Sequence, residues 1–395
     1  MTHAIQDWRE ERSQHLANAR TVLVKVGSAV VSGSHGLDGE VLGNLARQFA
    51  LLRNGGDASR RVILVSSGAV SAGRAVLAER NMPSDAVGLA QRQAVAAVGQ
   101  GRLILAWDEA CGRHGMTTAQ VLLTRDDLRA RSRFLHVRNT FAELLDRGIL
   151  PVVNENDTVS VEELRFGDND CLASLLVNLC NADLFVNMTS ASGVLAADPG
   201  TSPGAPVMEC IEDVGALDIA GLCGSKTLSG TGGMHSKLMA ARRAAQIGVP
   251  TLILPGREPD VLSTVLAGAA EGGKLPGTWV RPAAHAIPRR KFWMAYQTDP
   301  AGVVSVDEGA ANALLHKGGS LLPGGVRQVE GNFQQGALVR IVHEGGNLGV
   351  GLSNYTAAQL RRIMGLKRHQ VAAILGDAQY PEVVHRDNML LDAAI

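Results

Sequence analysis

The chain has 395 residues, of which 46% are hydrophobic and 19% are charged, and this length favours two domains over a single core. Lys plus Arg and Asp plus Glu both number 38, which argues against an overall field that would attract nucleic acid or a membrane. Five widely spaced cysteines with no CxxC pair argue against a zinc knuckle or a disulfide framework and fit the reducing cytoplasm.

The sequence indicates neither a signal peptide nor a membrane-spanning segment. Residues 1–20 are polar and lack the apolar stretch of a signal peptide. The most apolar segment, 171–188, is interrupted by Asn178, Asn181 and Asp183, which makes it too polar to span a bilayer. We therefore expect a cytoplasmic protein with no membrane partner.

Short apolar, β-branched runs alternate with helical patterns between residues 21 and 268. Strands that are apolar throughout and separated by helices predict a mostly parallel sheet covered by helices on both faces. In such folds ligands bind at the carboxyl ends of the strands, so the polar residues that follow each strand are candidates for a site. The expected strands are 21–26, 61–66, 117–123, 149–154, 183–188 and 250–254.

The character of the sequence changes after the last of these strands. Gly, Pro and basic residues without periodicity mark the stretch 269–297. We expect an N-terminal extension at 1–20, the α/β domain at 21–285, and a linker at 286–297. Short, Gly-punctuated runs predict a small β-rich domain at 298–378, followed by a tail at 379–395.

Two candidate functional stretches follow the first two strands. "VKVGS" places Lys25 late in a strand fit for burial, where a lysine needs an anionic partner; the alternative is an edge-strand lysine that points to solvent. "VSSGAVSAG" places Ser66, Ser67 and Gly68 in a turn whose amides can hold an anion; the alternative is an ordinary turn between strand and helix.

Two further stretches carry side chains suited to a zwitterionic small molecule. "NENDTVS" at 154–160 places several hydrogen-bonding side chains after a buried strand, although Asn and Asp are also common turn formers. Asp168, Asn169 and Asp170 precede a strong helical pattern. One of them could simply be the N-cap, worth about 1 kcal/mol, but a cap does not need three such residues.

A glycine-rich loop, "SGTGGMHSK" at 229–237, opens the helical pattern that follows it. It lacks the G-K-[ST] of a Walker A loop and the third glycine of the dinucleotide fingerprint. Glycine amides at a helix N-terminus still favour phosphate, and Lys237 adds a positive charge; a plain flexible loop is the alternative. Two lysines, a carboxylate cluster and a phosphate loop on one sheet together indicate phosphoryl transfer.

Taken in order along the chain, these motifs resemble those of the glutamate 5-kinases of the amino-acid kinase superfamily. The resemblance covers nearly the whole chain from residue 21, and the C-terminal part resembles the PUA domain of bacterial members. It implies a three-layer αβα sandwich, the amino-acid kinase fold, with a PUA-like domain appended. The motifs are "VKVGS", "SSGAVSAGR", "AAVGQGRL", "QVLLTRDD", "NENDTV", "GDND", "ADP", "GTGGMHSK", "VDEGA" and "VHRD".

The resemblance implies a reaction in which ATP and L-glutamate give γ-glutamyl phosphate and ADP, with Mg²⁺ on the nucleotide and no metal site made of protein side chains. It implies that Lys25, Asp170 and Lys237 are catalytic, with Asp170 orienting the two lysines. It implies that glutamate is bound by Ser67, Asp157 and Asn169. The implied nucleotide-binding residues are Lys25, Thr189, Ser190, Thr231, Gly232, Gly233, Met234, His235, Ser236 and Lys237.

The same resemblance implies a homo-oligomer, either dimer or tetramer, and feedback inhibition by proline at a site that overlaps the glutamate site. Three departures from the family pattern lie on the nucleotide side. Thr189-Ser190 stands where Thr-Asp is usual, Ser28-Ala29 where Thr-Ser is common, and Leu195 where an aromatic residue is common.

Two other functions are weighed against this one. The first is a kinase of the same fold acting on acetylglutamate, aspartate, carbamate or a nucleotide, which "NENDTV" and the PUA-like domain oppose. The second is a non-catalytic regulatory or RNA-binding protein that uses the PUA-like domain. Seven Lys or Arg and six Asp or Glu between 298 and 378 leave that region nearly neutral, so nucleic acid is not an expected partner.

Overall fold

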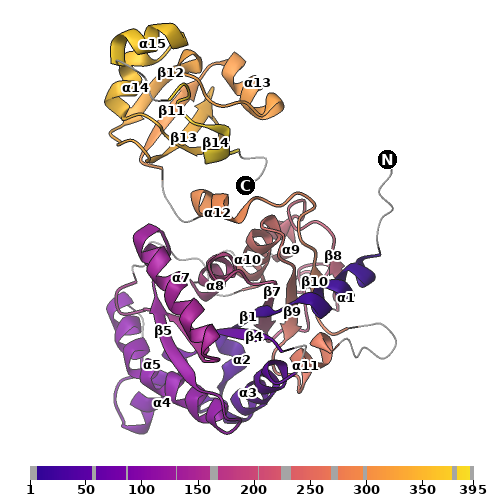
Figure 1. Ribbon diagram of the computed structural model, residues 1–395. Helices are drawn as coiled ribbons and strands as arrows, with labels where there is room; N and C mark the ends of the chain where they lie inside the picture. The colour runs from indigo at the N-terminus through magenta and orange to yellow at the C-terminus, as the bar shows by residue number, and fades with distance from the viewer. Residues whose placement is uncertain are drawn as a thin grey trace. The chain divides into compact units, whose positions relative to one another are not determined.

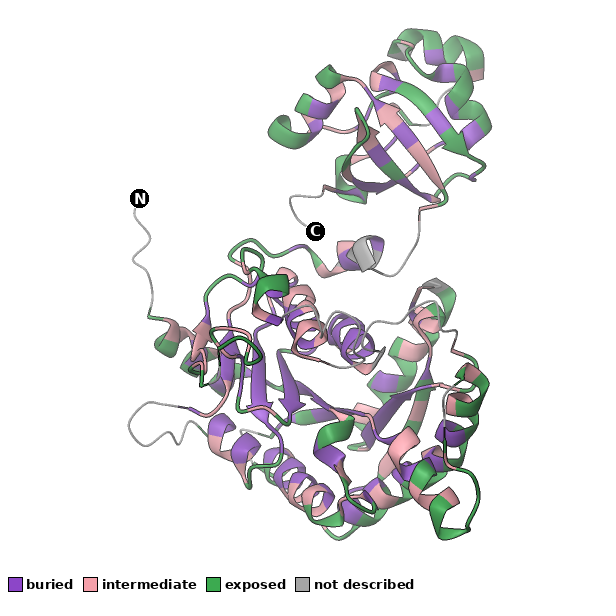
Figure 2. Cartoon of the chain, turned by 180° about the vertical axis from the view of Figure 1, so that it is seen from behind, coloured by how far each residue is buried: buried purple, intermediate pink, exposed green. Residues whose placement is uncertain are grey.

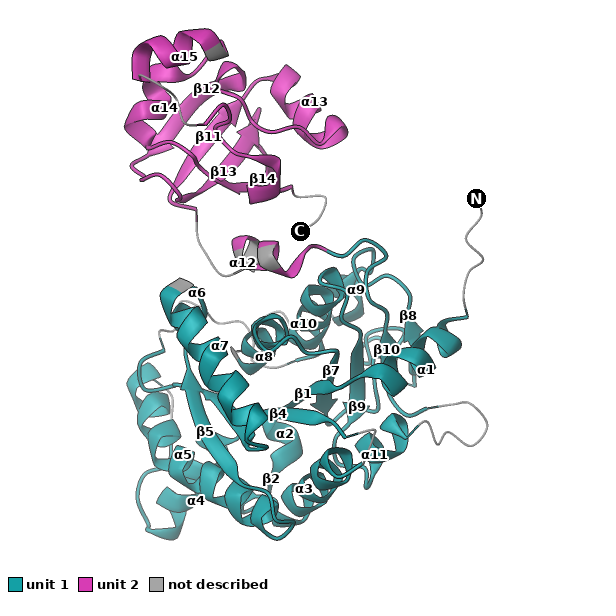
Figure 3. Cartoon of the chain, in the orientation of Figure 1, with its two compact units in different colours: residues 1–286 teal, residues 287–395 magenta. Residues whose placement is uncertain are grey.

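The computed structural model describes residues 7–55, 59–85, 88–129, 131–160, 168–202, 204–223, 233–267, 275–296, 300–375 and 380–391. The chain forms two compact units, residues 1–286 and residues 287–395 (Figure 3). No helix among the described residues has the length and apolar character needed to cross a membrane. The five cysteines are all free thiols.

An eight-stranded sheet forms the centre of the first unit, in the order β5-β6-β4-β1-β7-β9-β10-β8. Pairing is parallel from β5 to β9, antiparallel between β9 and β10, and parallel between β10 and β8. All six expected strands are present, and they form the continuous run of parallel pairs from β5 to β9. The strands are β1 (Thr21–Val26), β4 (Arg61–Ser66), β5 (Thr118–Leu123), β6 (Leu150–Glu155), β7 (Leu184–Thr189), β8 (Cys210–Ile211), β9 (Thr251–Pro255) and β10 (Thr278–Val280).

Helices cover both faces of this sheet (Figure 1), which gives the expected three-layer αβα arrangement. Helices α3, α5 and α11 lie on one face with α4 packed against α5, while α7, α8 and α10 lie on the other. A small hairpin, β2 (Ser32–Gly33) and β3 (Gly36–Leu37), follows α2. The helices are α1 (Trp8–Asn18), α2 (Ser28–Val31), α3 (Gly39–Arg53), α4 (Ala69–Glu79), α5 (Leu89–Gly112), α6 (Arg125–Arg129), α7 (Arg131–Asp146), α8 (Asp168–Leu179), α9 (Ile219–Cys223), α10 (Met234–Gln246) and α11 (Val261–Leu266).

The central strands are buried on both faces, and the alternation of their side chains determines which helical layer Lys25 faces. Strands β6, β7 and β9 are buried at every position, as Figure 2 shows for the middle of the sheet. In β1, Val24 and Val26 belong to the core cluster that includes residues of α3 and α5. Side chains alternate between the faces of a strand, so Lys25 faces the opposite layer, the one that contains α8 and α10.

Helix α1, within the segment expected to be an N-terminal extension, packs against the first unit. Helix α1 buries Leu16 in the main core, and Arg281 pairs with Glu11 of this helix and with Glu212. The polar sequence of α1 gave little indication of this packing, because the helix makes contact through a few residues only.

The second unit contains a five-stranded sheet, in the order β12-β11-β13-β14-β15. Segment 286–297, expected to be a linker, contains α12, and the expected tail contains β15, which pairs with β14. Both are held by a small cluster in which Ile287, Met294 and Leu390 are buried. The elements are α12 (Arg289–Tyr296), β11 (Gly302–Val306), α13 (Glu308–Lys317), η4 (Pro323–Gly325), β12 (Val326–Gly331), β13 (Leu338–His343), β14 (Gly346–Leu352), α14 (Ala357–Ile363), α15 (Arg368–Leu375), η5 (Arg386–Asn388) and β15 (Met389–Leu391).

Helices α4 and α5 cross in unusually close contact, and two glycines permit it. A Cβ atom at Gly99 would lie 1.9 Å from the carbonyl oxygen of Ala69, and one at Gly73 would lie 1.9 Å from that of Val95. Neither distance is possible for real atoms, so a side chain at either position would push the helices apart. This crossing matters because the first half of α5 contacts the end of β6 and the turn after it, through Gln100 with Asn154 and Gln93 with Ser160.

We expect Gly99→Ala to destabilise the first unit by about 1–3 kcal/mol, because the added methyl group overpacks the helix crossing. Gly101→Ala in the same helix is the matched control: nothing lies within 4 Å of its Cβ position, so the gain in helix propensity should stabilise the unit by up to about 1 kcal/mol. Urea unfolding followed by tryptophan fluorescence measures both changes. Equal effects of the two substitutions would contradict this account of the crossing.

Candidate active site

The carboxyl ends of β1, β4, β6 and β7 lie at the same edge of the parallel sheet, as expected for a ligand site in this class of fold. Lys25 is the fifth residue of the six in β1, and Ser67 follows the last residue of β4. Asn169 and Asp170 lie in the first turn of α8, and Lys237 lies in the first turn of α10. Four elements far apart in sequence therefore bring the predicted residues together.

A buried carboxylate between two buried lysines forms the centre of the site. Lys25 Nζ lies 2.7 Å from Asp170 Oδ1, and Lys237 Nζ lies 3.1 Å from Asp170 Oδ2. The side chains of Lys25, Asp170 and Lys237 are 4%, 0% and 5% exposed. Ionic groups this deeply buried are costly unless they are paired and hydrogen-bonded, so the cluster is a specific arrangement rather than a chance surface contact.

Two neutral donors complete the shell of Asp170. Asn187 Nδ2 donates to Asp170 Oδ1 at 2.9 Å, and the Ser236 hydroxyl donates to Asp170 Oδ2 at 2.6 Å. Each carboxylate oxygen thus receives one ammonium group and one neutral donor. With two lysines and one carboxylate, the cluster carries a surplus of one positive charge in a place from which water is nearly excluded.

The burial and the charges act in opposite directions on the pKa values of this cluster. Burial by itself raises the pKa of Asp170, but the charges of Lys25 and Lys237 outweigh it and hold the pKa at about 2. Burial lowers the pKa of Lys25 to about 8, an effect that Asp170 opposes and Lys237 reinforces. At neutral pH Asp170 is therefore ionised and Lys25 is protonated.

A second, uncharged group of side chains lies beside the charged cluster. Asn169 Nδ2 donates to Ser67 Oγ and to Asn154 Oδ1, both at 2.8 Å. Asn169 Oδ1 is buried and has no hydrogen-bond partner among the described residues. A buried acceptor without a donor is rare in proteins, and a ligand with N–H groups, such as an ammonium ion, would satisfy it.

The turn after β4 needs its glycine. Gly68 has a φ of 119° and is the N-cap residue of α4. A Cβ atom there would lie 2.9 Å from Cγ2 of Val31. The glycine therefore allows the turn that carries Ser67 to lie against α2, the helix that follows Lys25.

Other predicted residues lie around this centre or outside the described residues. Thr189 is the buried last residue of β7, and Ser190 after it is exposed. Asp157 lies in the turn that follows β6 and is partly exposed. Gly233 is the N-cap residue of α10, whose first two residues are Met234 and His235, both partly exposed. Thr231 and Gly232 lie outside the described residues.

Sequence reasoning missed one member of the charged cluster. Asn187 was counted as part of an apolar strand, although an amide in the middle of a fully buried strand is itself a signal that a polar partner lies nearby. Ser236 was assigned only to the nucleotide loop, and its hydrogen bond to Asp170 was not foreseen.

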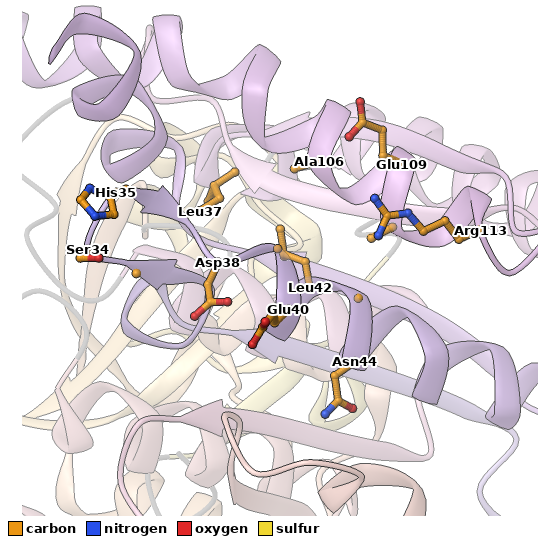
Figure 4. Close-up of a pocket in the computed structure, with 14 residues that line it drawn as sticks. Ser34, His35, Leu37, Asp38, Glu40, Leu42, Asn44, Ala106, Glu109 and Arg113 are labelled. Atoms are coloured by element: carbon orange, nitrogen blue, oxygen red, sulfur yellow. The ribbon is translucent and has the colours of Figure 1, made fainter. Parts of the chain in front are cut away.

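A separate pocket of about 660 Å³ lies between the β2–β3 hairpin, the start of α3 and the second half of α5 (Figure 4). Asp38 and Glu40 line one side, and Glu109 of α5 and Arg113, the C-cap residue of this helix, line the other. None of the residues predicted for the site contributes to it. The pocket is therefore distinct from the lysine–aspartate cluster.

Comparison with known proteins agrees with the resemblance inferred from the motifs. The Amino acid kinase family model matches residues 20–255, and the PUA domain model matches residues 302–375. A glutamate 5-kinase of Nitratidesulfovibrio vulgaris (strain DP4) is 58% identical over 98% of this chain and 100% of its own length. Those of Oleidesulfovibrio alaskensis and Maridesulfovibrio salexigens are 57% and 48% identical, over 98% and 97% of this chain and 100% and 99% of their own lengths.

The similarity extends through both units of the chain. Identity at this level over nearly the full length of each relative, together with the family match, leaves no other assignment for the fold. The chain belongs to the amino acid kinase family, in its glutamate 5-kinase group, and carries a C-terminal PUA domain.

Proposed function

We propose that this protein transfers the γ-phosphoryl group of ATP to the side-chain carboxylate of L-glutamate, giving L-glutamyl 5-phosphate and ADP in the first step of proline biosynthesis. The relatives that support this reaction are glutamate 5-kinases of 48–58% identity over nearly the whole chain. The observation on this chain that carries the proposal is the pair of buried lysines that share one aspartate.

The surplus positive charge of this cluster suits the chemistry of the reaction. Two anions must approach each other, the glutamate carboxylate and the terminal phosphate of ATP, and charge on the transferred group must be stabilised in the transition state. In the proposed role, Lys25 and Lys237 neutralise the phosphoryl oxygens, while Asp170 holds both ammonium groups at fixed positions. Low exposure strengthens each of these interactions relative to water.

The reaction needs no general base. A carboxylate oxygen of glutamate forms the new P–O bond, the bond between the γ-phosphorus and the bridging oxygen of ATP breaks, and ADP leaves with that electron pair. The acceptor is ionised at neutral pH, so no proton has to be removed. Among the described residues no histidine pairs with Asp170, and the proposed reaction does not require one.

The remaining predicted residues divide into an acceptor side and a nucleotide side. We assign Ser67, Asp157 and Asn169 to glutamate, with the buried Asn169 oxygen and the Asp157 carboxylate suited to its ammonium group. We assign to ATP the last residue of β7 with its successor, and the glycine-rich loop with the first turn of α10. These residues are Thr189, Ser190, Thr231, Gly232, Gly233, Met234, His235 and Ser236.

Mg²⁺ is expected on the nucleotide phosphates rather than on side chains of the protein. Both oxygens of Asp170 already accept from a lysine and from a neutral donor, which leaves this carboxylate poorly suited to bind a cation. When bound, the metal ion would supply further charge neutralisation on the phosphates.

Other parts of the proposal rest on the family. We propose a cytoplasmic homo-oligomer, either dimer or tetramer, that proline inhibits at a site overlapping the glutamate site. We propose that residues 21–285 form the kinase domain and that residues 298–378 form the core of the PUA domain. Helix α12 and strand β15 lie outside this core and extend it at either end of the sequence.

Lys237→Met should lower the turnover number at least about 100-fold, because it removes a charge that acts on the transition state. The measurement is hydroxylamine trapping of acyl phosphate with Mg-ATP and L-glutamate, and with acetylglutamate and aspartate as alternative acceptors. Lys317→Met, at an exposed position of α13 in the second unit, is the control and should leave turnover unchanged. Product formation by the Lys237 variant at the wild-type rate would rule out the role given to this lysine.

Activity should decline on the alkaline side as Lys25 loses its proton. Since its pKa is about 8, the group is charged below this pH and neutral above it. We therefore expect kcat/KM for ATP, measured at saturating glutamate, to fall about tenfold per pH unit above pH 8. Lys25→Arg keeps its charge at high pH, so whatever activity it retains should show no such decline; an identical decline in both proteins would point to another group.

Proline at millimolar concentration should lower the rate of ADP formation, and added glutamate should restore it, because in the proposed site the two amino acids compete for the ammonium-binding groups Asp157 and Asn169. A coupled assay of ADP release, run at several glutamate concentrations, measures the effect. Rates that do not change with proline would remove feedback inhibition from the proposal while leaving the reaction itself standing.

A further inference from the structure

We propose that Gln100 of helix α5 is a positioning residue for the acceptor substrate. It fixes the orientation of two asparagine side chains so that the Asn169 oxygen, rather than its NH₂ group, is presented to the ammonium group of glutamate. This inference rests on the proposed function and adds to it a residue that contacts neither substrate. The motif that contains Gln100, "AAVGQGRL", supported the family resemblance but received no role from the sequence.

A chain of three side-chain amides connects Gln100 to the acceptor site. Gln100 Oε1 accepts from Asn154 Nδ2 at 2.8 Å, and Asn154 Oδ1 accepts from Asn169 Nδ2 at 2.8 Å. Asn169 Nδ2 also donates to Ser67 Oγ at 2.8 Å. Asn154 is only 3% exposed, so water competes little for its amide, and its two hydrogen bonds define its orientation.

The polarity of this chain decides what Asn169 offers to a ligand. A side-chain amide has donors on one atom and acceptors on the other, so reversing one member of the chain reverses the next. With an acceptor at Gln100, the chain ends on Asn169 Oδ1, which is buried and has no partner among the described residues. If every hydrogen bond in this chain ran in the opposite direction, the Asn169 NH₂ group would face the ammonium ion, and two donors would then meet.

The backbone of α5 brings Gln100 to this place. The neighbouring Gly99 allows the close crossing with α4, and Gln93, seven residues earlier and so on the same face of the helix, donates to the carbonyl oxygen of Ser160 at 2.9 Å. Gln93 and Gln100 thus hold the two ends of the segment that carries Asp157. One face of α5 thus holds both ends of segment 154–160 on the proposed acceptor side.

Three substitutions of Gln100 test whether its role is to accept a hydrogen bond. They provide a side chain that only accepts, one that does neither, and one that only donates. Gln100→Glu offers acceptors only, Gln100→Met has a similar length and no hydrogen-bonding group of comparable strength, and Gln100→Lys offers donors only. We expect KM for glutamate to stay within about threefold of wild type in the Glu variant, to rise about tenfold in the Met variant and to rise further in the Lys variant. KM for ATP should change little in all three, because the nucleotide groups are not part of this chain.

The hydroxylamine assay gives these constants, and thermal unfolding reports the folding of each variant. Arg102→Met, at an exposed position two residues further along α5, is the control and should change neither KM. Equal increases in KM for glutamate in the Glu and Lys variants would overturn the inference, since they would reflect the burial of any charge. If the Lys variant does not fold, equal KM values in the Glu and Met variants would overturn it as well.

The outcome for the wild-type protein distinguishes this inference from the proposed function. Glutamate-dependent product from wild type, with no ordered change across the three variants, refutes only the role of Gln100. No product from wild type with any acceptor refutes the proposed function itself.

Discussion

The buried carboxylate of Asp170 is the interaction on which the rest of the site depends. It receives Lys25 from β1, Lys237 from α10, Asn187 from β7 and Ser236 from the first turn of α10. Without this anion, two ammonium groups would be buried beside each other, at a cost of several kcal/mol per ion. A single aspartate therefore makes the close approach of these elements possible, and the charges of the three groups sum to one positive charge. An anion that binds beside the lysines would reduce this excess, and a ligand that binds only the folded protein stabilises it by an amount that grows with the logarithm of its affinity.

Much of the first unit could be predicted because its main strands are buried on both faces. Apolar runs such as 62–65 and 184–186 are typical of that environment. Strands β8, β10 and β15, of only two or three residues, carry no periodic signal, and none of the three was foreseen. Helix α12 was not predicted, because Gly, Pro and basic residues precede it or lie at its start. Its apolar side chains pack against Leu338 and Leu390, which lie far away in the sequence.

In the site, too, some residues could be predicted from the sequence, while others depend on the three-dimensional arrangement of the strands. The polar residues that follow each strand could be named from the sequence, since a parallel sheet brings its carboxyl ends together. Asn187 could not be, because its role depends on strand register. In the pairing of β1 with β7, Lys25 lies opposite Asn187, so the two side chains emerge on the same face, next to Asp170. A shift of one residue would have turned Asn187 to the other layer, and no local pattern encodes that choice.

The two halves of the site differ in charge for a physical reason. On the side we propose for the transferred group, three buried ions provide strong fields that would favour a phosphoryl group. On the acceptor side, the residues adjoining this cluster are a hydroxyl and two amides, Ser67, Asn154 and Asn169. A fixed carboxylate in their place would repel the carboxylate that must attack and would favour its protonated, unreactive form. Neutral amides avoid this repulsion, but an amide can present either of two faces and must be oriented by its surroundings. A hydrogen-bonded chain that ends on a helix outside the reacting groups supplies that orientation without adding charge.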